Sequence, residues 1–314
     1  MNEISIIIPT RNRIETLKKC LIEINKSTIK PKEIIIIDQS DVKIDFENIN
    51  DDIFVNTTII YQDYPSLTKA RNNGLKNASG NIIIFMDDDT ILNKHSLEKL
   101  LKTFEMNNNI KLVTSIDINN NNNRRYPDVF GIIFGRKKLS KKGGYVCKGS
   151  MLGRYNNINL PISETQWAMG YFFAVKKDII NKYNLKFDEN LISYAYPEDL
   201  DFTYNYYKNV LKDNGKCVIN KDIYVNHLGS KEFRIESNKS LSMYVINRLY
   251  LSYKHFKSPL YRIILIWSDI GEILRRKISK EEYKTIIKVY KECFKYRKDL
   301  RNNKIHKNLL KLMR

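Results

Sequence analysis

Several features that would assign a chain to a familiar class are missing from this sequence of 314 residues. Its four cysteines include no C-x-x-C pair, which argues against a cysteine metal site and a disulfide framework. No stretch reaches the roughly 18 apolar residues that a membrane-spanning helix needs. The opening residues "MNEISIIIPTRNR" lack the basic region and the long apolar run of a secretory signal peptide. We therefore expect a cytoplasmic protein.

Acidic residues are scarce at the C-terminal end of the chain. The whole sequence has a formal net charge of +19, and residues 241–314, with 19 basic and 6 acidic residues, account for +13 of it. Solvated helix faces, an anionic lipid surface or nucleic acid could each explain such an excess. No nucleic-acid-binding motif accompanies the charge, so we expect no nucleic-acid partner.

Apolar periodicity predicts an α/β fold with a largely parallel sheet in the first 116 residues. Hydrophobic residues make up 42% of the chain, enough for a sizeable core. The continuous apolar runs, typical of strands buried on both faces, are residues 4–9, 33–38, 57–62, 81–89 and 110–116. Helical patterns alternate with them at residues 14–24, 66–80 and 94–106. Ligands of such sheets bind at the carboxyl ends of the strands.

The remainder of the chain is less regular. We expect a mobile insertion over residues 117–165, with an asparagine-rich loop at 119–125 and a basic loop at 135–144. The elements predicted after it are a strand at 167–175, a helix at 197–215, short strands at 216–220 and 223–227, and basic, aromatic helices from about 237 onward.

Three consecutive carboxylates, Asp87, Asp88 and Asp89, follow the apolar run "IIIFM". One Asp suffices to cap the helix that comes next, so three exceed that need. Adjacent carboxylates are hard oxygen ligands, which Mg²⁺ and Mn²⁺ prefer, and such an ion often joins carboxylates to a diphosphate. We therefore favour a divalent cation site at the end of this strand.

An ordered set of segments resembles family-2 glycosyltransferases of the GT-A fold. The segments are "SIIIPTRNR", "IIIIDQS", "KARNNGLKNASGNIIIFMDDD" and "PEDLDF", and the resemblance covers roughly residues 3–230. It implies an enzyme that uses a nucleotide-sugar donor and a divalent metal, Mn²⁺ or Mg²⁺, with inversion at the transferred sugar. The implied acceptor is a glycan or a lipid-linked glycan in surface polysaccharide biosynthesis.

The resemblance assigns donor-binding roles to the early motifs. Pro9, Thr10 and Arg13 match the loop that lies against the nucleotide. Asp38 matches the acid that accepts a hydrogen bond from N3–H of uracil or thymine, which implies a UDP- or dTDP-type donor. Arg71 matches a basic position that reaches the base or the diphosphate. Taken alone, Asp38 is also typical of a turn after a strand, and Arg71 of a solvated helix face.

For the metal site, the resemblance makes Asp89 the direct ligand. Asp87 and Asp88 become contacts of the ribose or of the metal shell. Many family members carry a histidine where His227 stands, completing the metal shell or touching the diphosphate. A lone histidine at a strand end is otherwise more often structural.

The pair Glu198 and Asp199 in "PEDLDF" matches the acids that family-2 enzymes present at a helix start. Inverting transfer needs a base that takes the proton of the acceptor hydroxyl as it attacks the anomeric carbon. We assign the base to Asp199 and the orientation of the acceptor to Glu198, with Asp201 a weaker candidate. The alternative is that these acids only stabilise a helix N-terminus through its dipole.

Acceptor contacts and membrane contacts are also predicted. Trp167, Gly170 and Tyr171 lie in the expected acceptor-side strand, where the aromatic rings could stack on sugars or simply pack in the core. The basic, aromatic helices suit a lipid headgroup layer, although a helical hairpin packed on the catalytic domain would look similar. We expect a protein peripheral to the inner face of the cell membrane.

Residues 1–236 are predicted to be the catalytic domain, divided into a nucleotide-binding half, 1–116, and an acceptor-binding half, 117–236. Residues 237–314 form a helical extension. Two alternative functions remain open. A sugar nucleotidyltransferase would more often show a glycine-rich phosphate loop, and "PTRNRIE" has no glycine. A catalytically inactive basic protein that binds membranes or anions would show no metal-dependent nucleotide binding.

Overall fold

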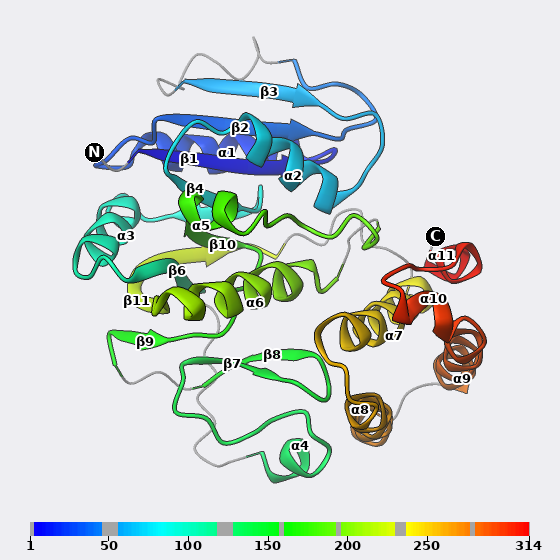
Figure 1. Ribbon diagram of the computed structural model, residues 1–314. Coiled ribbons are helices and arrows are strands. Elements are labelled where there is room, and N and C mark those ends of the chain that lie inside the picture. The colour runs from blue at the N-terminus through cyan, green and yellow to red at the C-terminus, as the bar shows by residue number, and fades with distance from the viewer. Residues whose placement is uncertain are drawn as a thin grey trace.

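The computed structural model has a mixed nine-stranded sheet at its centre. It describes residues 3–45, 56–117, 128–156, 160–192, 196–229, 237–276 and 280–313. The strands of this sheet are β1 (Ile4–Thr10), β2 (Glu33–Asp38), β3 (Thr57–Tyr61), β4 (Ile82–Met86), β5 (Thr90–Leu92), β6 (Ile110–Asp117), β9 (Ile162–Glu164), β10 (Phe172–Lys176) and β11 (Lys216–His227). They lie in the order β3-β2-β1-β4-β10-β6-β11-β5, and β9 pairs with β11 (Figure 1).

The first half of the sheet consists of the parallel strands β3, β2, β1 and β4. Every residue of β1 and β4 is buried, because helices cover both faces of this half. Helix α1 (Ile14–Asn25) packs on one face and α2 (Leu67–Asn77) on the other, while α3 (Ser96–Glu105) lies on the same face as α1 but packs against β6 and β11. The predicted α/β fold is confirmed, and the continuous isoleucine runs are its buried strands.

The strand that precedes the three aspartates is shorter than predicted. β4 ends at Met86 instead of continuing to residue 89. The Asp87 N–H donates to the carbonyl of Tyr171 at 3.1 Å, and the Thr90 N–H donates to the carbonyl of Asp87 at 3.2 Å. These bonds form a turn into β5, so the aspartates lie on a tight turn at the carboxyl end of the strand.

In the second half of the sheet, β10 runs antiparallel between β4 and β6. It begins at Phe172, so the predicted strand at 167–175 is a loop up to Tyr171. The two short strands predicted at 216–220 and 223–227 are one strand, β11, whose register against β6 shifts between Ile219 and Tyr224. Helices α5 (Lys177–Lys182) and α6 (Glu198–Val210) lie between β10 and β11 in the chain, and α6 continues into a 3₁₀ turn at Leu211–Asp213.

The irregular segment predicted at 117–165 contains ordered elements. They are helix α4 (Val129–Ile133), the antiparallel pair β7 (Gly144–Cys147) and β8 (Leu152–Tyr155), and β9. The predicted basic loop is present before β7, and its Arg136 is 5% exposed and bonded to other elements. The asparagine-rich stretch at 119–125 lies outside the described residues.

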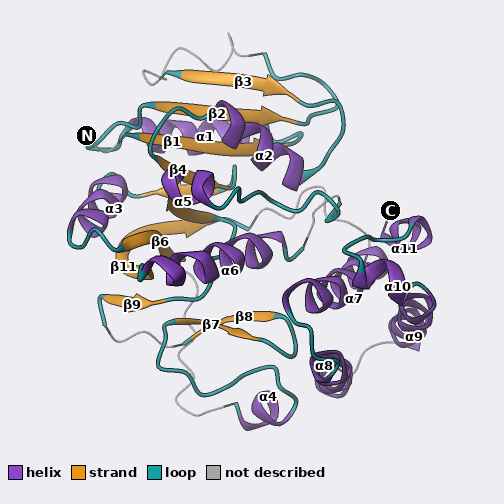
Figure 2. Cartoon of the chain, in the orientation of Figure 1, coloured by secondary structure: helices purple, strands orange, loops and turns teal. Residues whose placement is uncertain are grey.

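The described part of the C-terminal region contains five helices, which lie together at one side of the molecule, away from the sheet (Figure 2). They are α7 (Ser237–His255), α8 (Leu260–Arg276), α9 (Lys280–Lys295), α10 (Arg297–Arg301) and α11 (Lys307–Met313). Helix α7 joins the core through Met243, Ile246 and Tyr250, and its Arg248 is fully buried. None of the helices in the described ranges is both long enough and apolar enough to cross a bilayer.

Candidate active site

Asp87, Asp89 and His227 meet at the carboxyl end of β4. One candidate ligand atom from each lies within 4.8 Å of the others, and His227 Nε2 is 3.1 Å from Asp89 Oδ1. The pairing of β11 with β5 places His227 opposite Thr90 and so beside the acidic turn. Two carboxylates and an imidazole fit Mn²⁺, and the carboxylates alone suit Mg²⁺. The structure thus brings together the three residues predicted to hold a metal.

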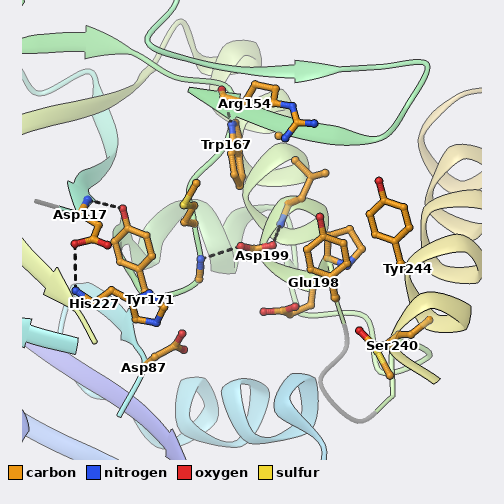
Figure 3. Close-up of a pocket in the computed structure, with 17 residues that line it drawn as sticks. Asp87, Asp117, Arg154, Trp167, Tyr171, Glu198, Asp199, His227, Ser240 and Tyr244 are labelled. Carbon is orange, nitrogen blue, oxygen red and sulfur yellow. Dashed lines mark hydrogen bonds between the residues drawn. The ribbon is translucent and has the colours of Figure 1, made fainter. Parts of the chain in front are cut away.

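His227 is held in place by its neighbours (Figure 3). Its ring stacks on Tyr171 with a centroid distance of 5.2 Å, and its backbone N–H donates to Asp117 Oδ1 at 3.3 Å. The Asp117 N–H in turn donates to the Tyr171 hydroxyl at 2.9 Å. The hydrogen bond to Asp89 raises the pKa of His227. Tyr171, predicted as an acceptor contact, therefore supports the imidazole.

Asp88 bonds to the loop after β1. Its Oδ2 accepts from Thr10 Oγ1 at 2.7 Å, and Arg13 Nη1 lies 3.2 Å from its Oδ1. Burial raises the pKa of Asp88 to about 6, against the opposing effects of Thr10 and Arg13. Pro9 precedes this loop within β1. The structure therefore joins the predicted nucleotide loop directly to the acidic turn.

Asp38 closes a turn after β2. Its Oδ1 accepts from the Ser40 N–H and its Oδ2 from the Ile44 N–H, both at 2.9 Å. The side chain is almost fully buried. The sequence is compatible with two roles for Asp38, recognition of the base and formation of a turn. These contacts are those of the turn-forming role.

Arg71 lies beneath the site and is completely buried. Its Nη1 is 2.7 Å from Glu198 Oε1, and its Nη2 is 3.0 Å from Asp87 Oδ1. Nη2 also donates to the carbonyl of Gly170 at 3.1 Å. The solvated helix arginine is thus ruled out, and the guanidinium contacts the acids of the site rather than reaching into the cleft.

Glu198 and Asp199 open helix α6, directly after Pro197. Asp199 Oδ2 accepts from the Gly170 N–H at 2.9 Å, and its Oδ1 accepts from its neighbour's N–H, that of Leu200, at 2.7 Å. Burial raises the pKa of both acids, opposed chiefly by the charge of Arg71. A Cβ on Gly170 would lie 3.0 Å from Arg71 Nη2, so glycine allows the close approach of these groups.

A cleft of about 780 Å³ contains both acidic groups. Asp87 and His227 line it together with Glu198 and Asp199. Trp167, predicted as an acceptor contact, also lines the cleft, but it is mostly buried against Tyr155, with ring centroids 5.0 Å apart.

Several lining residues were missed by the sequence prediction. They include Tyr196 and, labelled in Figure 3, Asp117, Arg154, Ser240 and Tyr244. Arg154 is anchored at Nε, which donates to the carbonyl of Arg136 at 3.0 Å, and the rings of Tyr196 and Tyr244 stack 5.8 Å apart. Only the position of Tyr196 beside "PEDLDF" offered a signal in the sequence. Tyr244 belongs to α7, so the helices after residue 237 contribute to the cleft.

Asp201 points away from the cleft into a buried polar cluster. Lys254 Nζ donates to its Oδ2 at 2.7 Å, and His255 Nε2 lies 2.7 Å from its Oδ1. The charge of Lys254 and the bond from His255 outweigh burial and lower the pKa of Asp201 to about 2. The weaker candidate for the base is therefore a structural residue that joins α6 to α7.

Residues 5–183 match the family model described as Glycosyl transferase family 2. The chain is also 26% identical over 329 aligned positions to the GalNAc(5)-diNAcBac-PP-undecaprenol beta-1,3-glucosyltransferase of Campylobacter jejuni, which covers 99% of this chain and 88% of the relative.

Solved structures share the fold at low identity. S. aureus TarS in complex with UDP-GlcNAc superposes with a TM-score of 0.57 and 17% identity, over 91% of this chain and 79% of that one. The Pyrobaculum calidifontis mannosyltransferase PcManGT in complex with GDP-Man and Mn²⁺ gives a TM-score of 0.52 at 12% identity, over 99% and 83%. These likenesses confirm the predicted GT-A type of α/β fold.

Proposed function

The chain belongs to glycosyl transferase family 2, and we propose that it is an inverting enzyme that transfers a sugar from a UDP- or dTDP-type donor to a glycan hydroxyl. One observation carries this proposal. Asp87 of the acidic turn and Asp199 of helix α6 line the same cleft, with Arg71 bonded to the acids of both segments. A donor group and an acceptor group can therefore meet between them.

The donor is proposed to bind at the acidic turn and the loop after β1. Thr10 and Arg13 already contact Asp88 there. Asp38 is proposed to accept from N3–H of the base in addition to holding its turn, since a carboxylate oxygen has more than one lone pair. The TarS structure, which contains UDP-GlcNAc, supports a UDP-sugar.

Asp87, Asp89 and His227 are proposed to hold Mn²⁺ or Mg²⁺. Their clustered donor atoms fit such an ion, and the Mn²⁺ in the PcManGT complex supports the assignment. When bound, the ion would supply positive charge against the diphosphate leaving group.

Asp199 is proposed to be the general base. The N–H groups of Gly170 and Leu200 fix its carboxylate, and burial raises its pKa, which increases its basicity. The acceptor hydroxyl gives its proton to Asp199 as its oxygen bonds to the anomeric carbon. The bond from that carbon to the phosphate oxygen breaks, and its electron pair leaves with the nucleoside diphosphate. Attack from the opposite side inverts the anomeric centre.

Arg71 is proposed to be a positioning residue. Its contacts with Glu198, Asp87 and Gly170 fix the distance between the acidic turn and the start of α6. Glu198 is still proposed to orient the acceptor. Its bond to Arg71 fixes the position of its carboxylate for that role.

The acceptor is proposed to be a glycan or lipid-linked glycan of a surface polysaccharide. Trp167, Gly170, Tyr171 and Arg154 all line the cleft. We propose that the first three contact the inner part of the acceptor and that the guanidinium of Arg154 binds an anionic group farther along. The C. jejuni relative is named for a diphosphate-linked polyprenol acceptor, which supports this class. Such an acceptor also supports a location at the cytoplasmic face of a membrane, with contact through the C-terminal helices.

Family membership favours sugar transfer over the nucleotidyltransferase alternative, and one assay separates it from an inactive binding protein. Purified protein is incubated with a panel of UDP-, dTDP- and GDP-sugars, with Mn²⁺ or Mg²⁺ and with a chelator. We expect metal-dependent release of the nucleoside diphosphate from one uridine or thymidine donor. Failure of every donor to bind or turn over in the presence of metal would refute the proposed activity.

A further inference from the structure

Helix α8 buries polar side chains beside Leu265 on its inner face, while most of its outer face is apolar. Ser268 and Asp269 are almost completely buried. The opposite face is a single apolar stripe whose side chains are 40–63% exposed: Leu260, Ile263, Ile266, Trp267, Ile270 and Leu274. A helix that packs against a core in water normally shows the reverse arrangement. This orientation therefore indicates that the stripe meets an apolar environment.

Buried ion pairs fix α8 in this orientation. Arg248 of α7 pairs with Asp269 at 2.5 Å, and Tyr290 of α9 donates to the same carboxylate. Arg136 donates to the carbonyl of Ser268 at 3.1 Å and pairs with Glu272 at 2.6 Å. Turning the apolar stripe inward would break all of these contacts, so its exposure is built into the fold.

Helix α4 extends the stripe. Trp267 stacks on Phe134 with centroids 4.7 Å apart, and its Nε1 donates to the carbonyl of Ile133 at 2.9 Å. Val129 and Ile133 are each 61% exposed, and α4 lies beside α8 at the lower edge of the molecule (Figure 1). We call the exposed apolar side chains of α4 and α8 the α4–α8 ridge. Contiguous exposed apolar patches on monomeric proteins often mark contact sites.

The charge around the ridge selects its partner. Lys257 is near the start of α8, and Lys137 and Arg275 contact Asp128 at the α4 end. Residues 241–314 alone carry a net charge of +13. Two copies meeting through this face would bring like charges together, whereas an anionic lipid surface would attract them while accepting the apolar stripe.

We infer that the α4–α8 ridge inserts into one leaflet of an anionic lipid bilayer, with α8 parallel to the membrane plane. Trp267 then lies at the boundary between headgroups and acyl chains, where tryptophan is enriched. The contact is apolar insertion rather than charge attraction alone. It also differs from the lipid contact predicted from the basic, aromatic composition of the C-terminal helices, because their residues Arg248 and Tyr250 are buried inside the protein.

The ridge is rigidly connected to the acceptor end of the cleft. Arg136, which holds the backbone of α8, also donates to the Tyr244 hydroxyl at 3.3 Å, and its carbonyl accepts from Arg154 Nε. Docking of the ridge would therefore set the cleft at a fixed height above the lipid headgroups. An acceptor presented from the membrane would then meet the cleft at that height. This step alone rests on the proposed function.

The test measures binding to vesicles without donor or acceptor, so its outcome is independent of catalysis. The vesicles contain phosphatidylcholine alone or mixed with phosphatidylglycerol, and some carry lipids brominated in their acyl chains. The chain has two tryptophans, and Trp167 is almost completely buried, so quenching reports mainly on Trp267. We expect flotation with the mixed vesicles and quenching of Trp267 by the brominated lipids, both persisting at high salt.

The triple variant Ile263→Ser/Ile270→Ser/Leu274→Ser removes part of the stripe. It should lower the partition coefficient at least about tenfold, since each side chain loses its transfer free energy. The matched control is Tyr283→Ser/Phe294→Ser, which removes exposed apolar side chains from α9 and should bind like the wild type.

Equal binding by the triple variant, or binding that salt abolishes without any quenching, would overturn the inference. A second contradicting result is a wild-type protein that is dimeric and binds no vesicles, together with a triple variant that is monomeric. The ridge would then be an interface between two copies of the chain. The quenching measurement uses the wild-type protein and stays decisive if the triple variant fails to fold.

Discussion

Arg71 and Glu198 form a buried ion pair of 2.7 Å across 127 residues of sequence, and the same guanidinium reaches Asp87 at 3.0 Å. One side chain therefore sets the distance between the turn proposed to bind metal and donor and the helix start proposed to hold the base. Its planar fork is suited to two carboxylates at once, whereas a lysine is a single point charge.

We predict that Arg71→Lys lowers kcat by roughly 10–100-fold, because a small displacement of positioned groups has a large effect on rate. The metal concentration needed for half-maximal activity should rise as well, since Asp87 loses its partner. Steady-state kinetics with metal titration measure both quantities.

The control for this substitution is Arg248→Lys, which alters an equally buried arginine that pairs with Asp269 and packs against Tyr244 but contacts none of the acids of the cleft. It should lower the melting temperature yet leave kcat and the metal requirement of the folded protein unchanged. Identical kinetic effects of the two substitutions would show that Arg71 acts only through stability.

The dependence of activity on pH follows from Asp199. A protonated Asp199 carboxyl cannot take the proton of the acceptor hydroxyl. Activity therefore falls as the pH drops through the pKa of Asp199. Because burial raises that pKa, the acidic limb of kcat/KM should lie above the ordinary aspartate value of about 3.9. The profile is recorded at saturating metal so that metal release does not contribute. An acidic limb at or below the ordinary value would contradict the role of Asp199.

Asp201 should contribute to stability and not to chemistry. Its pKa is about 2 in the folded protein and about 3.9 when unfolded, so the unfolded state binds more protons between these values. Its contribution, about 2–3 kcal/mol, is present above pH 4 and is lost as the pH falls toward 2. Denaturant unfolding at several pH values should show that Asp201→Asn removes this slope.

The control is Asp213→Asn, which disrupts a more exposed pair with Lys182 and should change stability little. Loss of transfer activity in a stably folded Asp201→Asn protein would return Asp201 to the candidates for the base.

Arg154 should affect the acceptor and not the donor. We predict that Arg154→Ala raises the KM for an acceptor carrying phosphate about tenfold, because a hydrogen bond to a charged group contributes about 1.5–3 kcal/mol. The KM for a neutral acceptor and for the donor should stay unchanged. Equal effects on charged and neutral acceptors would assign Arg154 a structural role, in which its Nε holds the hairpin by donating to the carbonyl of Arg136.

The sequence predicted the elements that depend on local patterns. Runs such as "ISIIIP" and "EIIIID" can only be buried strands, and the acids after them had to lie at one edge of the sheet. The turn at Asp87 was missed because it depends on a hydrogen bond from its N–H to Tyr171, 84 residues away. The continuity of β11 was missed because its irregular register interrupts the apolar pattern.

Tertiary contacts decided the rest of the site. On its own helix Arg71 looks like a solvated arginine, and it is buried only because Asp87, Gly170 and Glu198 are brought around it from distant parts of the chain. Arg154 lies on a short hairpin whose position no local pattern specifies. The mixture of aromatic and basic residues after 237 predicted a lipid-facing surface, but which side chains face outward depends on the buried pairs of α8.

The most direct test of the central claim is a comparison of donor binding and sugar transfer in Asp199→Asn. Asparagine keeps the shape of the side chain but cannot take the acceptor's proton. Calorimetric titration with the nucleotide-sugar and Mn²⁺ should give wild-type affinity, while transfer falls by about 10²–10⁴-fold. Transfer at the wild-type rate, or loss of donor binding in a correctly folded variant, would contradict the assignment of Asp199 as the base of a two-sided site.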